Sequence, residues 1–336
     1  MLLQVLGTAA GGGLPQWNCA CPGCTGARAH PERRRRHAAL AVHAGGGDWY
    51  LVNATPDIGD QIEATPALHP GAGPDMRRTP VAGVVLTDAE LDHTLGLARL
   101  REARDGVEVL ATAPVRDAVR EGLRLDTVLE PYTRVRWREL PLGRGAPLTD
   151  GSGIHAAAVP VSAKRPRYAV GVGHGAGVVA GVGHGARAVA GVGRYADAAP
   201  APAHAPAPDP DTWSIALHLT EPATGRTLLY APSLAVWSDA FDEAARVADC
   251  VIVDGTFWDD DEPVRAGFST RTATGMGHRP IAGPTGTAHR LAHLPGRVLY
   301  THLNNTNPLN DPHAEQHKLL AEWGIEVAAD GMVIEL

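Results

Sequence analysis

The chain contains 336 residues, 44% of them hydrophobic, which suits one large α/β domain or two small ones. Its net charge of -7 at pH 7 disfavours partners such as nucleic acid and anionic membrane surfaces. No stretch has the length of a membrane span, and the start, MLLQVLGTAAGGG, lacks the basic region of a signal peptide.

The elements expected from the sequence form two strand-rich blocks, each followed by helices. The first block has strands at 2–7, 38–44 and 49–54, and continues with strand–helix units at 81–86 with 94–103 and 107–114 with 115–124. The second block has strands at 135–140 and 153–160 and a hairpin over 214–232. Strands at 250–255 and 297–303 then alternate with helices at 241–248, 286–293 and 313–323, before a hairpin over 325–336. This order predicts an α/β fold, an αββα sandwich of two mixed sheets flanked by helices.

One segment belongs to neither block. From residue 169 the chain reads AVGVGHGAGV, VAGVGHGARA and VAGVGRYADA, a ten-residue repeat, and a Pro/Ala tract follows to residue 210. Such a segment buries too little apolar surface to offset its ordering entropy. We therefore expect a single domain over 1–336 with a flexible surface insertion at about 169–210. Its histidines, His174, His184 and His204, are an alternative metal site, but a Gly-rich segment provides little preorganisation.

Three of the four cysteines, Cys19, Cys21 and Cys24, lie within six residues around Pro22-Gly23. Three thiolates at this spacing fit on one turn and suit a closed, structural zinc site, whereas exposed free thiols so close together would oxidise. The cluster also indicates a reducing compartment, so the cytoplasm is the expected location. The fourth zinc ligand has to come from elsewhere, and the candidates are Asn305, Asp311, His313, His317 and His30.

A second polar cluster follows an apolar strand. Residues 84–97 read VVLTDAELDHTLGL, so Asp88, Glu90, Asp92 and His93 come directly after the strand. Asp92 alone could cap the helix that follows, but capping does not explain the other three groups. Alternation along an extended turn would aim the three carboxylates toward the carboxyl edge of the sheet, where α/β folds place active sites. The simplest occupant of such a cluster is a divalent metal.

A strand that ends in a six-residue cluster with Asp-His last resembles the metallo-β-lactamase superfamily, whose usual form is HxHxDH and which here reads DxExDH. Over nearly its full length the chain resembles one family in particular, the B proteins of pyrroloquinoline quinone (PQQ) biosynthesis. The matching stretches are CACPGC (19–24), LTDAELDHTLGL (86–97), LLYAPSLAVW (228–237), VDGTFWDDDE (253–262), MGH (276–278), THLNNTNP (301–308) and DGMVIEL (330–336). The insertion at about 169–210 lies outside the resemblance.

The resemblance implies roles for individual residues. Asp92 and His93 match the Asp-His pair that holds metal throughout the superfamily, and His302 matches the last metal histidine. His278 lies where relatives place a further active-site histidine, as a metal ligand or a catalytic group. Asp254 ends the strand beside it.

Departures from the superfamily pattern indicate one metal ion. Hydrolytic relatives have a metal-bridging acid where this chain has Ala231-Pro232-Ser233, and a further histidine where it has Lys164-Arg165. What remains is two histidines and one carboxylate, the ligand set of non-haem Fe(II) oxygenases. Asp88 and Glu90 then serve as catalytic groups that tune the metal, or as additional ligands. Zn²⁺ can occupy the same ligands in place of Fe(II).

By resemblance, the reaction is the O₂-dependent hydroxylation of the tyrosine ring in a crosslinked Glu-Tyr dipeptide. Such a substrate carries several carboxylates, and Lys164, Arg165 and Arg167 are placed in the sequence to meet them, although a solvated surface loop is the favoured interpretation of these three cations. Two alternatives remain open, a phosphodiesterase-like metal-dependent hydrolase and a non-catalytic PQQ carrier. The oligomeric state, including a homo-oligomer, is also left open.

Overall fold

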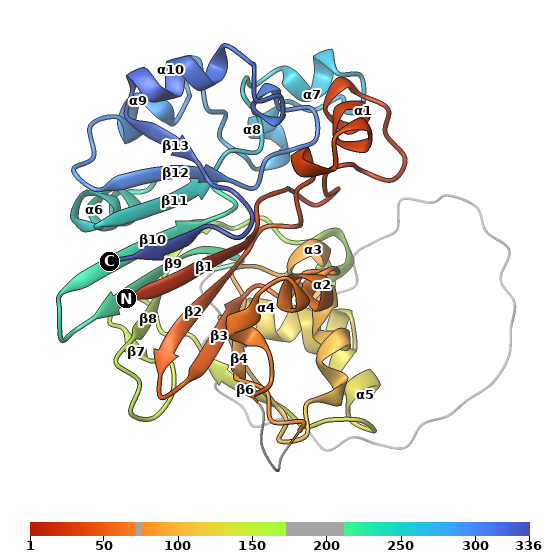
Figure 1. Ribbon diagram of the computed structural model, residues 1–336, viewed down its shortest axis with the longest axis vertical. Helices are drawn as coiled ribbons and strands as arrows, with labels where there is room; N and C mark the ends of the chain where they lie inside the picture. The colour runs from red at the N-terminus through yellow and green to blue at the C-terminus, as the bar shows by residue number, and fades with distance from the viewer. Residues whose placement is uncertain (72–75, 173–211) are drawn as a thin grey trace, which may run out of the picture.

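The computed structural model describes residues 1–71, 76–172 and 212–336, and shows two seven-stranded sheets that pack face to face (Figure 1). The first sheet has the order β14 (Val333–Glu335), β1 (Leu2–Gly7), β2 (Ala39–Gly45), β3 (Asp48–Val52), β4 (Val81–Val85), β5 (Val107–Ala111) and β6 (Val135–Glu139). The second has the order β13 (Ile325–Val327), β12 (Arg297–Thr301), β11 (Cys250–Asp254), β10 (Arg226–Ala231), β9 (Ser214–Glu221), β8 (His155–Ser162) and β7 (Ala146–Pro147). Both sheets are mixed, as expected.

Helices cover the outer faces of both sheets. Beside the first sheet lie α2 (Ile58–Glu63), η2 (Pro66–Leu68), α3 (Leu91–Thr94), η3 (Leu95–Glu102), α4 (Ala113–Asp117), η4 (Ala118–Gly122) and α5 (Leu125–Leu129). The second sheet is covered by α6 (Asp239–Val247), α9 (Ala288–Leu291) and α10 (Gln316–Glu322). Connecting segments contain α1 (Pro22–Ala29), η1 (Pro31–Arg33), η5 (Arg167–Ala169), α7 (Glu262–Arg265), α8 (Ala273–Met276) and η6 (Pro308–Asn310). None of the described helices is long and apolar enough to span a membrane.

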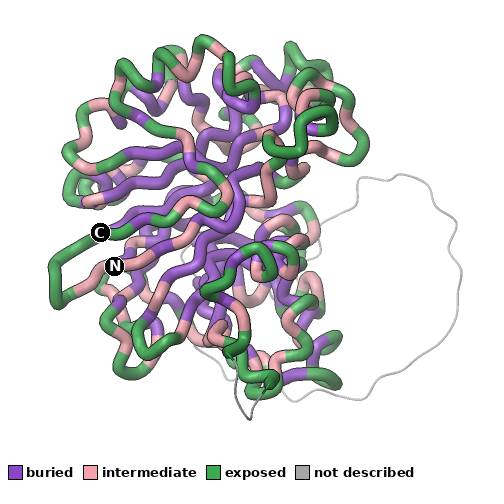
Figure 2. The backbone as a smooth tube through the Cα atoms, viewed as in Figure 1, coloured by how far each residue is buried: buried purple, intermediate pink, exposed green. Residues whose placement is uncertain are grey.

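Alternation along the strands divides the core into three apolar layers, so that most strand residues are buried (Figure 2). In β11, Ile252 points into the layer between the sheets, where it joins Tyr50 and Leu217. Its neighbour Val251 points to the outer face and packs in the same layer as Phe241 of α6. Near-continuous apolar runs such as CVIVD in β11 are typical of strands that are buried on both faces.

Two strand predictions were wrong. The hairpin expected over 325–336 does not form, because β13 pairs with β12 in the second sheet whereas β14 pairs with β1 in the first. The turn between them instead pairs with β1, with Val5 N–H donating to Met332 O and Gly331 N–H to Val5 O, both at 2.8 Å. This covers an edge of β1 that would otherwise expose unpaired backbone groups. Strand β6 was also assigned to the wrong block, since it pairs with β5 at the edge of the first sheet.

The helix predicted over 94–103 begins earlier and changes type. Helix α3 starts at Leu91, and the chain becomes 3₁₀-helical at Leu95. The cause is a competing contact with residue Ala54, whose N–H donates to His93 O and whose carbonyl accepts from Gly96 N–H, each at 2.8 Å. Asp92 therefore lies inside the first turn and is not the cap, so its interpretation as a capping residue was wrong. The three carboxylates also do not alternate along an extended turn.

The repeat insertion falls largely on residues 173–211, which lie outside the described residues, as do His174, His184 and His204. The first residues of the expected insertion are part of the core. Ala169 and Val172 are buried in the layer between the first sheet and its helices. Tyr168 donates a 2.5 Å hydrogen bond to Ala89 O. Packed structure thus continues to residue 172.

Candidate metal centre

The residues singled out after β4 meet those after β11 and β12 at one edge of the sandwich. The carboxyl ends of β4, β8, β10, β11 and β12 surround a cavity of about 640 Å³ that is lined by Asp92, His93, His278 and His302. The two sheets join directly beneath it, where Ile215 N–H donates to Thr87 O at 2.9 Å. The cavity lies where α/β folds bind ligands.

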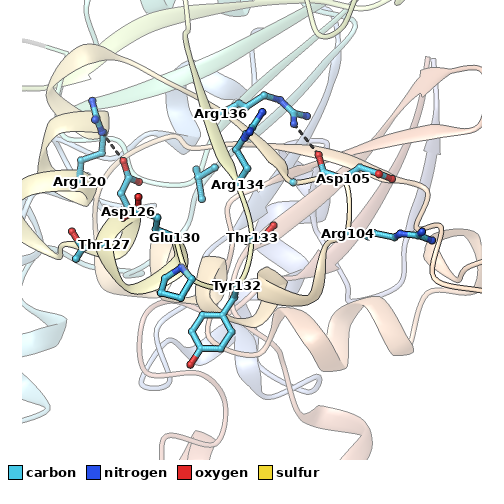
Figure 3. Close-up of a pocket in the computed structure, with 13 residues that line it drawn as sticks. Arg104, Asp105, Arg120, Asp126, Thr127, Glu130, Tyr132, Thr133, Arg134 and Arg136 are labelled. Carbon is cyan, nitrogen blue, oxygen red and sulfur yellow. Dashed lines mark hydrogen bonds and ion pairs between the residues drawn. The ribbon is translucent and has the colours of Figure 1, made fainter.

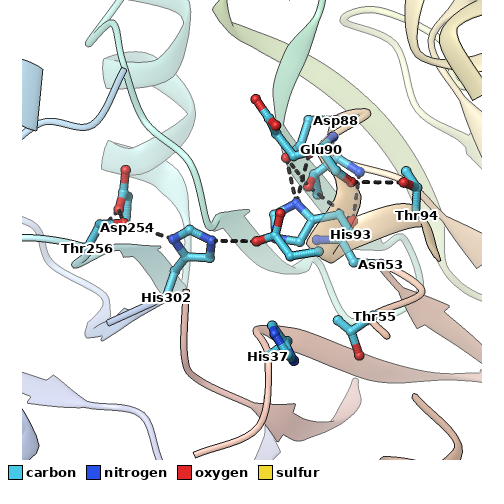
Figure 4. Close-up of polar contacts among 12 residues, drawn as sticks. His37, Asn53, Thr55, Asp88, Glu90, His93, Thr94, Asp254, Thr256 and His302 are labelled. Carbon is cyan, nitrogen blue, oxygen red and sulfur yellow. Dashed lines mark hydrogen bonds and ion pairs between the residues drawn. The ribbon is translucent and has the colours of Figure 1, made fainter. Parts of the chain in front are cut away.

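His93 is held in one orientation by Asp88. The Nδ1 atom of His93 lies 2.8 and 2.9 Å from the two Asp88 oxygens and donates to them (Figure 4). Glu90 N–H and the Thr87 hydroxyl also donate to Asp88, so this buried carboxylate has all the partners it needs within the protein. Burial lowers the pKa of His93, but the negative charges of Asp88 and Asp92 outweigh burial and raise it to about 9. Asp88 thus orients His93 and leaves its Nε2 atom facing the cavity.

Thr256 and Asp254 orient the other two histidines. The Thr256 hydroxyl donates to Asp254 at 2.6 Å, so its oxygen accepts from Nδ1 of His302 at 2.8 Å. Nδ1 of His278 donates to Asp254 at 2.7 Å. Asp254 also accepts hydrogen bonds from Leu234 N–H and Thr256 N–H. Because Asp254 is buried and accepts all of these hydrogen bonds, it has no free position for a metal. Each histidine therefore keeps Nε2 for the cavity.

Asp92 is partly buried and differs from the buried Asp88 and Asp254 because it has almost no hydrogen-bond donors. Its Oδ2 lies 3.4 Å from Nε2 of His302 and 3.7 Å from Nε2 of His93. Within the described residues, no backbone amide or hydroxyl donates to this carboxylate, and His93 Nε2 is buried without any hydrogen-bond partner. Burial would raise the pKa of Asp92, but the adjacent imidazoles hold it well below its usual range.

The donor set of Asp92, His93 and His302 fits a divalent metal. The three ligand atoms lie within 4.8 Å of one another. Two ligands at about 2.1 Å from one ion lie roughly 3 to 4 Å apart, which agrees with the spacing around Asp92. An ion here would satisfy both the unpartnered His93 nitrogen and the donor-poor carboxylate. One ring nitrogen of His278 also lies within 4.8 Å of ligand atoms of His302 and Asp254, and His278 lines the same cavity.

Glu90 lies apart from the metal cluster. Its carboxylate is 3.8 Å from Lys164 Nζ, and it is not among the groups that converge with Asp92. Burial and the negative charge of Asp88 raise the pKa of Glu90. Of the acids in the motif, Asp92 is the one that faces the Nε2 atoms of the histidines, whereas Asp88 binds Nδ1 of His93 and Glu90 pairs with Lys164.

The three cysteines converge as the sequence predicts. The sulfurs of Cys19, Cys21 and Cys24 lie within 4.8 Å of one another, at the start of α1. The side-chain Nδ2 of Asn305 lies 3.1, 3.4 and 3.3 Å from these sulfurs. Rotating the amide by 180° brings its oxygen to this position, where it can serve as a metal ligand.

The other candidates for the fourth position lie in other contacts. His30 pairs with Glu32, and Asp311 with Arg33. His317 Nε2 contacts Leu309 O at 3.2 Å, and His313 borders a separate cavity. Asn305 is therefore our choice for the fourth ligand of the cysteine site.

Several residues of the site were missed by the sequence analysis. Asn53 accepts from Thr87 N–H at 3.0 Å and fixes the end of β4, and its positive φ of 70° marks a specialised turn. His37, which lies below the cluster in Figure 4, pairs with Asp57 at 3.1 Å. Burial lowers the pKa of His37, but the negative charges of Asp57 and Asp92 outweigh burial and raise it. Thr256 lies in the quoted stretch VDGTFWDDDE, but nothing in that pattern indicates that one hydroxyl bonds to two functional residues.

Known proteins resemble this chain over its full length. Residues 48–189 and 183–303 match the family model described as a beta-lactamase superfamily domain. The chain is 37% identical to coenzyme PQQ synthesis protein B of an Azoarcus species, with 100% of both chains covered. The chain belongs to the coenzyme PQQ synthesis protein B family. This confirms the family that the motifs indicated.

Solved structures confirm the fold. Zn²⁺-bound PqqB from Methylobacterium extorquens is 29% identical, with a TM-score of 0.80 and full coverage of both chains. A diphosphatase of the PhnP family shares the fold at 17% identity, with a TM-score of 0.63 over 100% of this chain and 97% of that one. The metallo-β-lactamase-like αββα sandwich is thus the correct fold class.

This member of the PQQ synthesis B family departs from the superfamily pattern at two places, and both lie at the cavity. Ser233, which stands where hydrolytic relatives have a bridging acid, lines the cavity without offering a carboxylate. Lys164 and Arg165, which replace a histidine, also line it and bring positive charge. The cavity therefore holds one complete two-histidine, one-carboxylate set, and Asp254 is fully used in orienting His278.

A larger groove of about 900 Å³ lies beside α5 and β6 (Figure 3). Arg120 pairs with Asp126 at 2.7 Å there, and Arg136 donates to the backbone carbonyl of Asp105 at 2.8 Å. None of the metal-ligating clusters found among the described residues lies in this groove. It is not the candidate catalytic site.

Proposed function

We propose that this chain acts in PQQ synthesis as a non-haem Fe(II)- and O₂-dependent hydroxylase of the tyrosine ring in a crosslinked Glu-Tyr intermediate. The observation that carries the proposal is the single set of Asp92, His93 and His302, with nitrogens and one carboxylate directed at a common point. Two histidines and one carboxylate leave coordination positions open for O₂ chemistry. The reducing state needed for the three cysteines also suits a cytoplasmic protein.

When bound, Fe(II) supplies the redox chemistry with O₂ that amino-acid side chains lack. The overall reaction inserts one oxygen atom of O₂ into a ring C–H bond and reduces the other to water, with two electrons from a small-molecule reductant and two protons. Asp88 and Thr256 hold His93 and His302 so that both Nε2 atoms face the cavity. Asp254 does the same for His278, and we assign His278 Nε2 as the group that accepts the phenolic proton of the substrate.

The hydrolase alternative is less well supported. A two-metal hydrolase needs a bridging acid between its ions, and the chain has Ala231-Pro232-Ser233 at that position. Among the described residues, Asp254 is the acid that converges with both His278 and His302, and its oxygens already accept four protein hydrogen bonds. The diphosphatase similarity supports the fold alone.

The decisive experiment is anaerobic reconstitution with Fe²⁺ or Zn²⁺, followed by addition of the crosslinked dipeptide, a reductant and O₂. We expect O₂ consumption and a product heavier by one oxygen atom with iron only. Equal turnover with zinc in the absence of O₂ would instead indicate a hydrolase. Tight binding of PQQ without turnover under any condition would indicate a carrier.

A further inference from the structure

Four cationic side chains border the cavity above the metal cluster. Lys164, Arg165 and Arg167 come from the segment that follows β8, and Arg271 comes from the segment that precedes α8. The cations thus belong to two separate walls of one cavity. The four side chains make different contacts. These contacts distinguish a cation that already binds protein groups from a cation that is available to a ligand.

Lys164 is already used by the protein. Its Nζ donates to Met276 O at 2.6 Å, at the end of α8, and lies 3.8 Å from the Glu90 carboxylate. Its side chain also packs on Gly277, where a Cβ atom would lie 2.9 Å from Lys164 Cδ. Lys164 therefore ties the two walls together, and Glu90 offsets its charge.

Arg165, Arg167 and Arg271 have no carboxylate partner among the described residues, and Arg165 and Arg271 are distinguished from Arg167 by contacts that fix the side chain of the first and the backbone of the second. The Arg165 guanidinium lies 5.1 Å from the ring centre of Trp213, a contact that holds it by a cation–π interaction and leaves its N–H groups available. The backbone of Arg271 is fixed by Ser269, whose Oγ accepts from Arg271 N–H at 2.9 Å. A guanidinium is a planar fork of donors that matches a carboxylate.

A pair of stacked phenylalanine rings lies next to His278 at the wall of the cavity. Phe257 lines the cavity, and its ring centre lies 6.1 Å from that of His278 in an edge-to-face arrangement. Phe268 stacks on Phe257, with ring centres 6.3 Å apart. A flat ring that enters the cavity beside His278 can carry anionic groups toward the two walls.

We propose that Arg165 and Arg271 are specificity-determining residues, which bind two separate carboxylates of the substrate and orient its ring over the metal cluster. The proposal rests on the proposed function for the identity of the substrate. It assigns recognition to these two arginines, whereas Lys164 positions α8 and does not bind the substrate.

The test uses two probes with the same ring, benzene-1,3,5-tricarboxylate and benzoate, titrated calorimetrically into the zinc-loaded protein. We expect the tricarboxylate to bind wild type at least tenfold more tightly than benzoate. Arg165→Gln and Arg271→Gln should each weaken tricarboxylate binding about tenfold, the size of one charge-assisted pair, and leave benzoate binding within twofold. Arg165→Lys and Arg271→Lys should recover part of the loss.

Two control variants distinguish direct contact from general positive charge. Arg167→Gln removes a cation of the same cavity, and Arg134→Gln removes one of the remote groove, and both should change tricarboxylate affinity by less than twofold. A tenfold loss in Arg167→Gln would overturn the assignment, because binding would then follow the field of the patch. Unchanged affinity in both Arg165→Gln and Arg271→Gln would overturn it as well. Melting temperatures and metal content verify that each variant is folded.

Steady-state kinetics separate this proposal from the proposed function. With the crosslinked dipeptide and iron, both glutamine variants should raise KM about tenfold and leave kcat unchanged. If iron supports no oxygenation but the variants lose tricarboxylate binding, Arg165 and Arg271 remain assigned to carboxylate binding and the hydroxylase proposal fails. If oxygenation proceeds with wild-type KM in both variants, recognition fails and the hydroxylase proposal stands.

Discussion

His302 and Asn305 lie three residues apart on one loop and face two different sites. His302 contributes to the candidate metal centre, and the Asn305 amide contacts the sulfurs of Cys19, Cys21 and Cys24. His302 has a positive φ of 57°, a conformation that non-glycine residues adopt only when neighbouring contacts hold them. The cysteine site is thus one of the anchors of the loop that presents a metal-centre histidine.

The cysteine cluster should hold a structural zinc ion. Cys21→Ser or Asn305→Ala should lower the melting temperature by roughly 5 to 10 °C, because zinc binding there is coupled to folding. Differential scanning calorimetry with zinc analysis checks this, and Cys250→Ser, which changes a buried cysteine far along the chain, is the matched control. A Cys21→Ser protein that keeps its zinc and its melting temperature would show that the cysteine site is not structural.

Loss of the cysteine site should also weaken the metal centre through His302. We expect Asn305→Ala to reduce Co²⁺ affinity at the centre about tenfold, because His302 loses an anchor for its strained backbone. The visible absorption of Co²⁺ bound without thiolate ligands reports this site separately from the cysteines. Unaltered Co²⁺ affinity in a variant with an empty cysteine site would mean that the two sites are independent.

Within the Asp88–His93 motif, single substitutions should have graded effects. His93→Ala should abolish metal binding at the centre and leave the cysteine site filled. Asp88→Asn should keep the metal with affinity reduced about 10- to 100-fold, since Asp88 orients His93 through Nδ1. Glu90→Gln should change metal affinity less than Asp88→Asn does, because Glu90 pairs with Lys164 instead. Equilibrium dialysis with metal analysis measures the metal affinity of the three variants. A loss in Glu90→Gln as large as that in His93→Ala would indicate that Glu90 is a ligand.

The free energy of unfolding should fall as the pH rises, because of the buried carboxyl group of Glu262. Burial raises its pKa from 4.5 to about 7, although the Thr306 hydroxyl and the Trp258 N–H each donate a 2.6 Å hydrogen bond to its carboxylate. Between these two pKa values the folded state holds a proton that the unfolded chain releases, so this contribution to stability is lost as pH rises through 7. Relative to Glu262→Gln, the wild type should lose about 2 to 3 kcal/mol of unfolding free energy between pH 5 and pH 8. Urea unfolding of the wild type and of Glu262→Gln at each pH measures this difference. The same change of unfolding free energy with pH in both proteins would contradict the prediction.

The repeat segment should be dispensable from residue 173 onward. Replacing 174–208 with a short Gly/Ser linker should preserve zinc content, iron binding and turnover, because loop length changes closure entropy only slowly. A deletion that begins at residue 170 should be less stable, since it removes Val172 from the core. Loss of metal from the shorter deletion would give the repeat histidines a role.

The fold class and the candidate metal-ligating residues follow from local patterns in the sequence. Alternating and continuous apolar runs predict strands because their period matches the pleat, and the ligand-rich stretches after β4 and β12 stand out because the acids and histidines follow apolar strands. The cysteine spacing likewise predicts a metal site, since a single turn brings the three sulfurs together.

Only the tertiary structure decided how these groups divide their roles. Asp88, Asp92 and Asp254 look alike in sequence, yet the first and third are saturated by protein donors whereas Asp92 faces two histidine nitrogens. The partition of β13 and β14 between the sheets and the choice of Asn305 among five candidates also depend on contacts between residues far apart in the chain. Local patterns carry no information on such distances. The protein donors around a carboxylate therefore decide whether it orients a ligand, as Asp88 and Asp254 do, or becomes one, as we propose for Asp92.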